Sequence, residues 1–380
     1  MVNGGMMRIS VDRNNFLKSL GHVYRIVDRR NTASILGNVL IKANGELIQL
    51  KATDLELQVS EELTANIEQP GSATVPAYLL YDVIRRLPAG AEVKIELNND
   101  NGQVRIISGR VNYKLQSLPA SDFPDSKSVE WQHSFTLSAK ELRPILSATQ
   151  SAISTDETRY CLNGIYMHIV RNKDDVPMLR LVATDGHRLS VGELAAPDNS
   201  LEMPGLIIPR KAVLEMQKML AEGFAQDIAI DICETKIGFT VGDLSLVSKL
   251  IDGQFPDYEK IIPSDHDKFL TVDREEFIAS VGRVSVVSND YARALKFDLD
   301  MDNLRLSMES LDADSAEDCL NCHYRGEVLE IGFNAKYLLD EASQFTQENI
   351  IFSFSNSSSP CVMRDGEKTT ILYILMPMRL

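Results

Sequence analysis

The feature that most constrains the fold is one order of elements that recurs three times along the 380 residues. Three helix starts share a pattern in which a capping side chain precedes an apolar stripe at helical spacing. These starts lie at Asp12, Ser138 and Asp273, which are 126 and 135 residues apart. Ser138 with Glu141 forms a capping box, and Asp273 with Glu276 forms its aspartate variant. The sequence therefore predicts three successive repeats of similar architecture.

Each first helix is followed by the same further elements. Alternating and β-branched segments predict strands, and second helices are expected at residues 78–87, 211–220 and 336–345. Two repeats end in a Phe-Pro-Asp segment, at 123–125 and 255–257, where the proline breaks a strand and opens a connector. The order of elements is that of the α+β class. It predicts three domains, at residues 1–127, 128–264 and 265–380.

Composition places the chain among ordinary globular proteins and limits how it could bind nucleic acid. Hydrophobic residues make up 44% and charged residues 24%, a balance that excludes a disordered or collagen-like chain. The net charge of −15 means that binding to nucleic acid cannot rest on a generally basic surface. No apolar run is long enough to span a bilayer, and the start lacks the order of a signal peptide, so we expect a cytoplasmic location. The five cysteines are mostly isolated and are expected to be reduced thiols.

The alternative to a non-catalytic protein is a metabolic enzyme with three similar domains, which would need a catalytic constellation. The sequence has no phosphate-binding glycine loop, no H-E-x-x-H and no G-x-S-x-G. Asp185 and His187 could be drawn into a Ser–His–Asp triad, but residues two apart in one turn rarely form such a relay. Gly186 supplies a permissive backbone there, and by composition the segment is a turn.

A Cys-x-x-Cys-His motif, at Cys319 to His323, matches covalent haem attachment and half of a zinc site. No second close pair of ligands accompanies it. If residues 318–324 form one strand, Cys319 and Cys322 point to opposite faces and cannot share a ligand. We therefore expect two ordinary thiols, no metal and no cofactor.

Several segments together resemble a known family. They are Ser34–Asn38, Ala52–Glu56, Arg159–Gly164, Ala183–Leu189, Ser248–Tyr258, Ile331–Asn334 and Tyr373–Leu380. On these motifs the chain strongly resembles the bacterial DNA polymerase III β subunit, the sliding clamp, over essentially its whole length. Only residues 1–5 look like additional sequence.

The resemblance implies a DNA clamp fold with three similar domains per chain. In that family a head-to-tail homodimer closes six domains into a ring, with helices lining the hole and sheets outside. Such a ring encircles duplex DNA, slides without sequence specificity and acts as a non-catalytic processivity subunit of the polymerase. Enclosure needs no high affinity, so the resemblance implies an acidic exterior with basic residues facing the hole, which agrees with the net charge of −15.

Basic residues on the polar faces of the repeated helices are candidates for contact with DNA phosphates, although each could equally be a solvated charge. The helix faces supply Lys18, Arg25, Lys140, Arg143, Lys211, Lys218, Arg283 and Lys336. The resemblance favours Arg30 and the pair Arg210 and Lys211, and it adds Tyr160. Contacts of this kind would be independent of base sequence and sensitive to salt.

The resemblance also implies a hydrophobic pocket between the second and third repeats that captures short linear peptides. Its partners in the family are the replicative polymerase α subunit, the clamp loader δ subunit, other polymerases and repair proteins. The implied pocket residues are Arg159, Leu162, Thr184, Gly186, His187, Arg188, Leu189, Pro256, Lys260, Ile261, Ser359, Met376, Pro377, Met378 and Arg379. Flexible methionines suit a surface that accepts several peptides. Without the resemblance, an apolar C-terminal strand is more simply core packing.

The sequence departs from the family pattern near this pocket. Cys161 stands where a second aromatic residue is expected, and Asp156 and Glu157 add negative charge nearby. Lys260 keeps a positive charge but lacks the planar fork of the arginine expected there.

Ring closure is expected between the first repeat of one chain and the third repeat of the other, through edge strands that pair across the interface. The candidate strands are residues 104–115 and 286–296. Their apolar anchors would be Tyr113, Leu115, Val286 and Val287.

Overall fold

The structure is a computed structural model that describes residues 7–29, 33–98, 102–124, 129–221, 227–288, 294–310, 314–367 and 370–380. By its internal packing the chain divides into two compact units. The first comprises residues 1–137 and 224–249, and the second comprises residues 138–223 and 250–380. Each unit combines antiparallel sheets with helices, which confirms the predicted α+β class.

The first unit contains two antiparallel sheets. One has the order β5-β1-β7-β8-β9, formed by β1 (Arg8–Asp12), β5 (Asn66–Gln69), β7 (Glu92–Asn98), β8 (Gln103–Ser108) and β9 (Val111–Gln116). The other has the order β10-β15-β16-β17-β4-β3-β2-β6, formed by β2 (Asn38–Asn44), β3 (Leu47–Thr53), β4 (Leu57–Thr64), β6 (Gly71–Pro76), β10 (His133–Leu137), β15 (Ile228–Ile232), β16 (Lys236–Val241) and β17 (Leu244–Lys249). Its helical segments are α1 (Arg13–Val23), α2 (Ala77–Arg86), η1 (Tyr24–Ile26), η2 (Ser34–Gly37) and η3 (Ala120–Asp122).

The second unit also contains two sheets. One has the order β14-β11-β12-β13-β26-β25-β24-β18-β22, formed by β11 (Gly164–Arg171), β12 (Pro177–Thr184), β13 (Arg188–Ala195), β14 (Leu206–Pro209), β18 (Lys268–Asp273), β22 (His323–Arg325), β24 (Asn349–Phe354), β25 (Cys361–Asp365) and β26 (Ile371–Leu375). The other has the order β21-β20-β19-β23, formed by β19 (Ala294–Asp300), β20 (Asn303–Glu309), β21 (Ser315–Asn321) and β23 (Leu329–Asn334). Its helical segments are α3 (Ala139–Gln150), α4 (Arg210–Ala221), α5 (Arg274–Val284), α6 (Ala335–Ala342), η4 (Glu157–Leu162), η5 (Asp198–Ser200), η6 (Tyr258–Ile261) and η7 (Ser285–Val287).

Two strand pairings join segments that are far apart in the sequence, and each makes one long sheet. In the first unit β17 pairs with β4, which places Ser248 opposite Leu57; we call this pairing the first seam. In the second unit β13 pairs with β26, which places Leu189 opposite Ile374; we call this pairing the second seam. Both seams connect strands of successive predicted repeats, so each long sheet continues from one repeat into the next.

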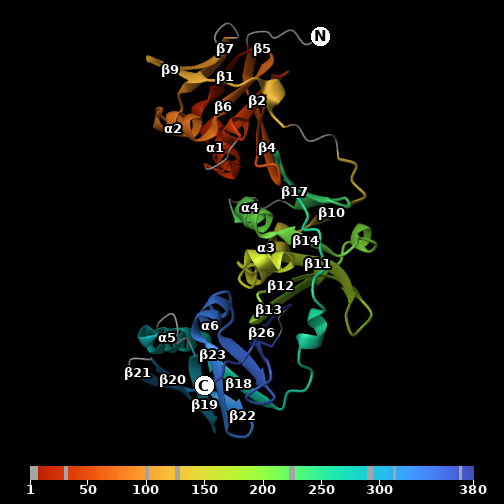
Figure 1. Ribbon diagram of the computed structural model, residues 1–380, viewed down its shortest axis with the longest axis vertical. Coiled ribbons are helices and arrows are strands. Elements are labelled where there is room, and N and C mark those ends of the chain that lie inside the picture. Colours follow the sequence, from red (N-terminus) through yellow and green to blue (C-terminus); the bar gives the residue numbers. More distant parts are fainter. Residues whose placement is uncertain are drawn as a thin grey trace. The chain divides into compact units, whose positions relative to one another are not determined.

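The helices occur in three packed pairs, α1 with α2, α3 with α4 and α5 with α6, as Figure 1 shows within each unit. Their predicted apolar stripes are buried: Phe16, Leu20, Leu146, Phe277 and Val281 are all fully enclosed. The expected spacing of apolar residues therefore does form the core face of each first helix.

Two of the three predicted caps are confirmed. The Asp12 carboxylate accepts bonds from the backbone N–H groups of Asn14 and Asn15 at 2.9 and 3.0 Å. Asp273 accepts one from Glu276 at 2.8 Å. The side-chain bond predicted for Ser138 is wrong, because the N–H of Glu141 donates instead to the backbone carbonyl of Ser138 at 3.1 Å.

The predicted strand 318–324 is also wrong. The chain leaves β21 at Asn321 and enters β22 at His323, and these strands belong to different sheets. Cys319 is exposed, whereas Cys322 is half-buried against the core, and all five cysteines are free thiols. Across the described residues no group of three or more potential ligands could hold a metal ion. In that same part of the chain, no helix is long and apolar enough to cross a membrane.

Candidate functional site

The second seam brings the C-terminal strand beside the turn that follows β12. Leu189 lies opposite Ile374, and Arg188 lies opposite Leu375. The pairing extends one step beyond β26, because the Met376 N–H donates to the His187 carbonyl at 3.0 Å. Residues that the sequence places almost two hundred positions apart thus form one surface.

The turn at residues 184–188 is fixed by its own polar side chains. The Thr184 hydroxyl donates to the Arg188 carbonyl at 2.7 Å and accepts from the Gly186 N–H at 3.1 Å. Asp185 Oδ1 accepts from the backbone N–H groups of His187 and Arg188 at 2.9 and 3.0 Å. The predicted turn is confirmed, and the Asp185 carboxylate holds the backbone rather than orienting an imidazole.

Gly186 suits the centre of this turn. Its φ of +87° lies in the region that L-residues with a side chain rarely adopt. Arg159 crosses the turn here and donates from Nη1 to the Asp185 carbonyl at 3.2 Å. A Cβ atom on Gly186 would lie 2.7 Å from that same nitrogen. The glycine therefore lets Arg159 lie close over the turn.

An apolar cluster forms the floor beneath the second seam. Leu189, Ile374 and Phe255 are buried in it, and Leu162 packs against its edge while still partly exposed. The ring of Phe255 stacks on Tyr166 with their centroids 5.0 Å apart. This floor offers the apolar area that an inserted side chain would need.

A groove of about 600 Å³ opens next to this floor. Four of the predicted pocket residues line it: Lys260, Ile261, Ser359 and Met376. The Lys260 side chain is 81% exposed, and its ammonium lies 2.6 Å from the Asp257 carboxylate. The hydrogen bond to Asp257 raises the pKa of Lys260, so the ammonium and this carboxylate form an exposed ion pair beside the groove.

Arg188 does not face this groove. Its side chain is only 8% exposed, and its Nη1 lies 3.1 Å from Glu341 Oε1 and 3.2 Å from Asp340 Oδ2. The guanidinium also lies over the Tyr337 ring, 4.3 Å from the centroid. Arg188 therefore ties the turn to helix α6 and is occupied within the protein.

The last residues of the chain divide between two surfaces. Met376 lines the groove of the second seam, whereas Pro377, Met378 and Arg379 line a different hollow with Gly332. The Met378 N–H donates to the Gly332 carbonyl at 2.8 Å, which anchors the terminus on β23. The structure thus brings only the first of these C-terminal residues to the predicted pocket. Pro256 is exposed in the segment before η6.

The predicted DNA-binding residues in the second unit are mostly exposed on helices. Lys140 and Arg143 are exposed on α3, and Arg210 and Lys211 begin the neighbouring α4. Cations at the start of a helix oppose its dipole, an arrangement that favours a bound anion. Tyr160, in η4, is 57% exposed.

Of the other predicted DNA-binding residues, Arg30 lies outside the described residues. Arg283 differs from the helix residues above because it already has an acidic partner. Arg283 is 61% exposed, but its guanidinium lies 2.5 Å from Asp318 Oδ2. This bond is the main reason that the pKa of Asp318 is lowered. Contact of Arg283 with a phosphate would compete with its existing partner.

The predicted interface strands are only partly correct. Strand β9 is an edge strand, with Leu115 buried and Tyr113 half-buried on it. Residues 286–296 do not form one strand, because Val286 and Val287 lie in η7, which continues directly from α5. The end of this range begins β19, which is an interior strand of its sheet. Val286 is 80% exposed, whereas Val287 packs against the core. The open edge of that sheet is β21, whose edge position the sequence does not reveal, because it depends on partner strands elsewhere in the chain.

The fold and site define a multidomain α+β protein with repeated helix pairs, long sheets continued across domain seams and a peptide-sized groove. Models of the N-terminal, central and C-terminal domains of the DNA polymerase III beta subunit match residues 7–127, 136–257 and 259–379. The chain therefore belongs to the DNA polymerase III beta subunit family, the beta sliding clamps. This confirms the resemblance seen in the sequence, and the family is a non-catalytic processivity factor of the polymerase, not an enzyme.

Curated relatives and solved structures are similar to this chain over nearly its whole length. The beta sliding clamp of Caulobacter vibrioides is 39% identical over 98% of this chain and all of the relative. That of Escherichia coli K12 is 34% identical over the same share of this chain and all of its own length. A crystal structure of the sliding clamp from Bartonella birtlesii bound to griselimycin is 50% identical, covers 99% of this chain and all of its own, and has a TM-score of 0.96.

Proposed function

We propose that two copies of this chain close head to tail into a ring of six similar domains that encircles duplex DNA and tethers the replicative polymerase. The domain limits we propose are 1–127, 128–264 and 265–380. Membership of the sliding clamp family supports this function, and so do the three packed helix pairs. A protein that acts on the bacterial chromosome would work in the cytoplasm.

Closure of the ring would pair edge strands of two copies. Strand β9 of one copy and β21 of the other are open edges of their sheets, which makes them available for antiparallel pairing. Leu115 and Tyr113 on β9 and the exposed Val286 beside the β21 sheet would supply apolar contact. Two identical contacts between unlike surfaces close such a ring and stop further growth.

The DNA contacts would be made by side chains of exposed helix faces and their neighbours. We propose Arg30, Tyr160, Lys140, Arg143, Arg210, Lys211 and Arg283 for this role. The packing of α3 against α4 supports a shared basic surface of the residues on those two helices. Contacts to phosphates alone would let the ring slide and would weaken with salt.

The groove at the second seam would bind short linear peptides of the polymerase α subunit, the clamp loader δ subunit, other polymerases and repair proteins. The observation that carries this proposal is the juxtaposition of a buried apolar floor, the 184–188 turn and the open groove beside Met376. The binding of griselimycin by the clamp from Bartonella birtlesii supports a ligand site in this family. Each buried leucine or phenylalanine would contribute about 1.5–3 kcal/mol, so partners could exchange.

Deletion of residues 376–380 tests this assignment, since it should abolish stimulation of the polymerase and leave the dimer intact. The deletion also removes the Met378–Gly332 bond, so Met376→Asp provides a milder test by placing a charge in the groove. Met301→Asp is the matched control, because Met301 is 84% exposed on the turn between β19 and β20. Polymerase stimulation that survives both the deletion and Met376→Asp would contradict the pocket assignment.

A further inference from the structure

The turn at residues 53–57 repeats the hydrogen bonding of the turn at the second seam. The Thr53 hydroxyl donates to the Leu57 carbonyl at 2.9 Å and accepts from the Leu55 N–H at 3.0 Å. Asp54 Oδ1 accepts from the N–H groups of Glu56 and Leu57 at 3.0 and 2.7 Å. Leu55 has a φ of +79°, close to the +87° of Gly186 in the other turn. The two turns therefore share one backbone design.

The strand beside this turn repeats the second seam as well. The Lys249 N–H donates to the Glu56 carbonyl at 2.9 Å, as the Met376 N–H donates to the His187 carbonyl at 3.0 Å. By the pairing register, Lys249 thus takes the place of Met376, and Val247 takes that of Ile374. The first seam is a second copy of the scaffold on which we place the peptide groove.

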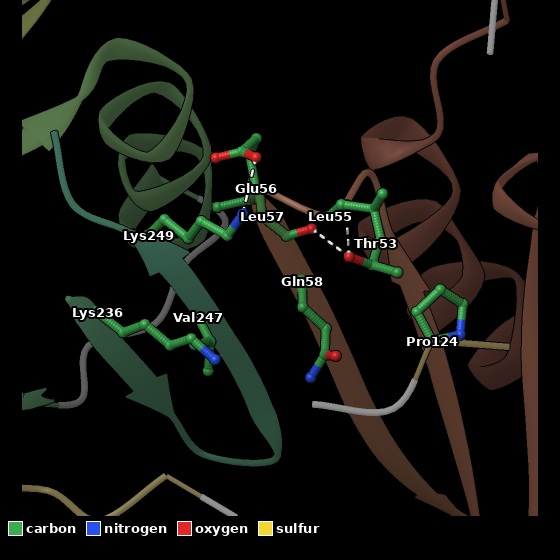
Figure 2. A pocket seen from close by; sticks show the side chains of 9 residues that line it. All are labelled: Thr53, Leu55, Glu56, Leu57, Gln58, Pro124, Lys236, Val247 and Lys249. Carbon is green, nitrogen blue, oxygen red and sulfur yellow. Dashed lines mark hydrogen bonds and ion pairs between the residues drawn. The ribbon is translucent and has the colours of Figure 1, made fainter. Parts of the chain in front are cut away.

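A hollow of about 190 Å³ lies at this first seam, and Figure 2 shows its lining. Val247, the buried Leu57 and the half-exposed Leu55 supply apolar atoms. Pro124 closes one side, and it follows Phe123 as Pro256 follows Phe255 at the second seam. The hollow is smaller than the groove at the second seam, so it would admit one side chain of modest size.

The two seams differ in the charged and polar side chains that line them. Lys249 and Lys236 border the first seam, where Figure 2 shows them on the neighbouring strands β17 and β16. Glu56 pairs with Lys249 at 2.9 Å, which leaves a net positive charge at the hollow on a chain whose net charge is −15. At the position of the buried Leu189 stands the polar Gln58. An occupant of matching character would carry carboxylates around one apolar side chain.

We propose that the first seam is a second docking site of the clamp, which takes a short, extended, acidic segment of a partner protein. One apolar side chain of that segment lies against Leu55 and Val247, and its carboxylates meet Lys236 and Lys249. This site would let a partner hold the clamp at the first seam while another occupies the second. The proposal uses the second-seam groove as its structural precedent, so its test separates the two sites.

The test is methyl NMR of the full-length protein with the probe peptide acetyl-Asp-Leu-Asp-Leu-Asp-amide. We expect the methyl signals of Leu55, Leu57 and Val247 to shift with added peptide, and the shifts to shrink as salt is raised. Lys236→Glu should raise the dissociation constant at least fivefold. Lys94→Glu, the same charge change on the other sheet of this unit, should leave the constant unchanged.

Three results would overturn the proposal. The first is an absence of shifts at the first seam, and the second is shifts confined to Leu162, Leu189 and Ile374 at the second seam. The third is equal binding of a peptide in which lysines replace the aspartates. If the Met376→Asp variant still shows peptide-induced shifts at the first seam, binding there is independent of the second-seam groove.

Discussion

At the scale of single residues, Arg188 illustrates how a side chain in a binding motif can serve the fold instead. Its guanidinium is bonded to Asp185, Asp340 and Glu341 and lies over Tyr337. The motif at residues 183–189 indicated a turn at a binding site. It carried no information about α6, whose acidic residues lie about 150 positions further along the chain and bond to Arg188. The family resemblance supplied four residues that line the groove, whereas the inward orientation of Arg188 depends on long-range packing.

The partner of Arg188 makes stability depend on pH. Burial raises the pKa of Glu341 from 4.5 to about 8, although the Arg188 guanidinium opposes the shift. The folded protein thus binds this proton more tightly than the unfolded chain, so the contribution of Glu341 to stability is fully present below pH 4.5 and is lost as pH rises through about 8. We expect Glu341→Gln to show a smaller fall in the free energy of unfolding between these pH values, measured by urea titration.

The control for that prediction is Glu348→Gln, which changes an exposed carboxylate in the same unit. The control should keep the pH dependence of the native chain. If Glu341→Gln keeps the same dependence, the buried carboxyl does not hold its proton as proposed.

At the scale of elements, the sequence predicted what is local and missed what is long-range. Helix faces follow from residues three and four apart, and the turn at 184–188 follows from its own side chains, so both were predictable. The edge strand β21 was missed, because the position of a strand in a sheet depends on partners far along the chain. The hydrogen bonds within the two turns are local, whereas the strand pairings that place each turn at a seam are long-range.

The helix caps provide a prediction with an internal comparison. Asp273 caps α5 through its side chain, whereas Ser138 makes no side-chain cap bond at α3. Asp273→Ala should therefore lower the free energy of unfolding by about 0.5–2 kcal/mol. Ser138→Ala should lower it by at most a few tenths, also measured in urea. Equal losses for the two variants would show that the cap geometry does not decide the stability.

At the scale of the whole molecule, the account depends on closure of the ring. Val286 is 80% exposed in η7, next to the open edge β21, where the proposed interface would cover it. Family membership and the open edges β9 and β21 favour the same interface. The acidic charge of the chain then poses no difficulty, because enclosure holds the DNA without tight binding.

Val286→Glu should weaken the dimer by at least about tenfold, because a charge would be buried in the interface without a partner. Sedimentation velocity over a range of protein concentrations measures this change. Met301→Glu, at an equally exposed position on a turn, should leave the dimer unchanged. A dimer of native stability in Val286→Glu would place the interface elsewhere.

Topological linkage to DNA is the central claim, and one measurement tests it most directly. The purified protein would be loaded on nicked circular DNA by a matching clamp loader with ATP, and its retention measured before and after the circle is cut. The account predicts retention on the circle and loss from the ends of the linear DNA. Equal retention on both would mean ordinary binding to the duplex, and it would contradict the ring.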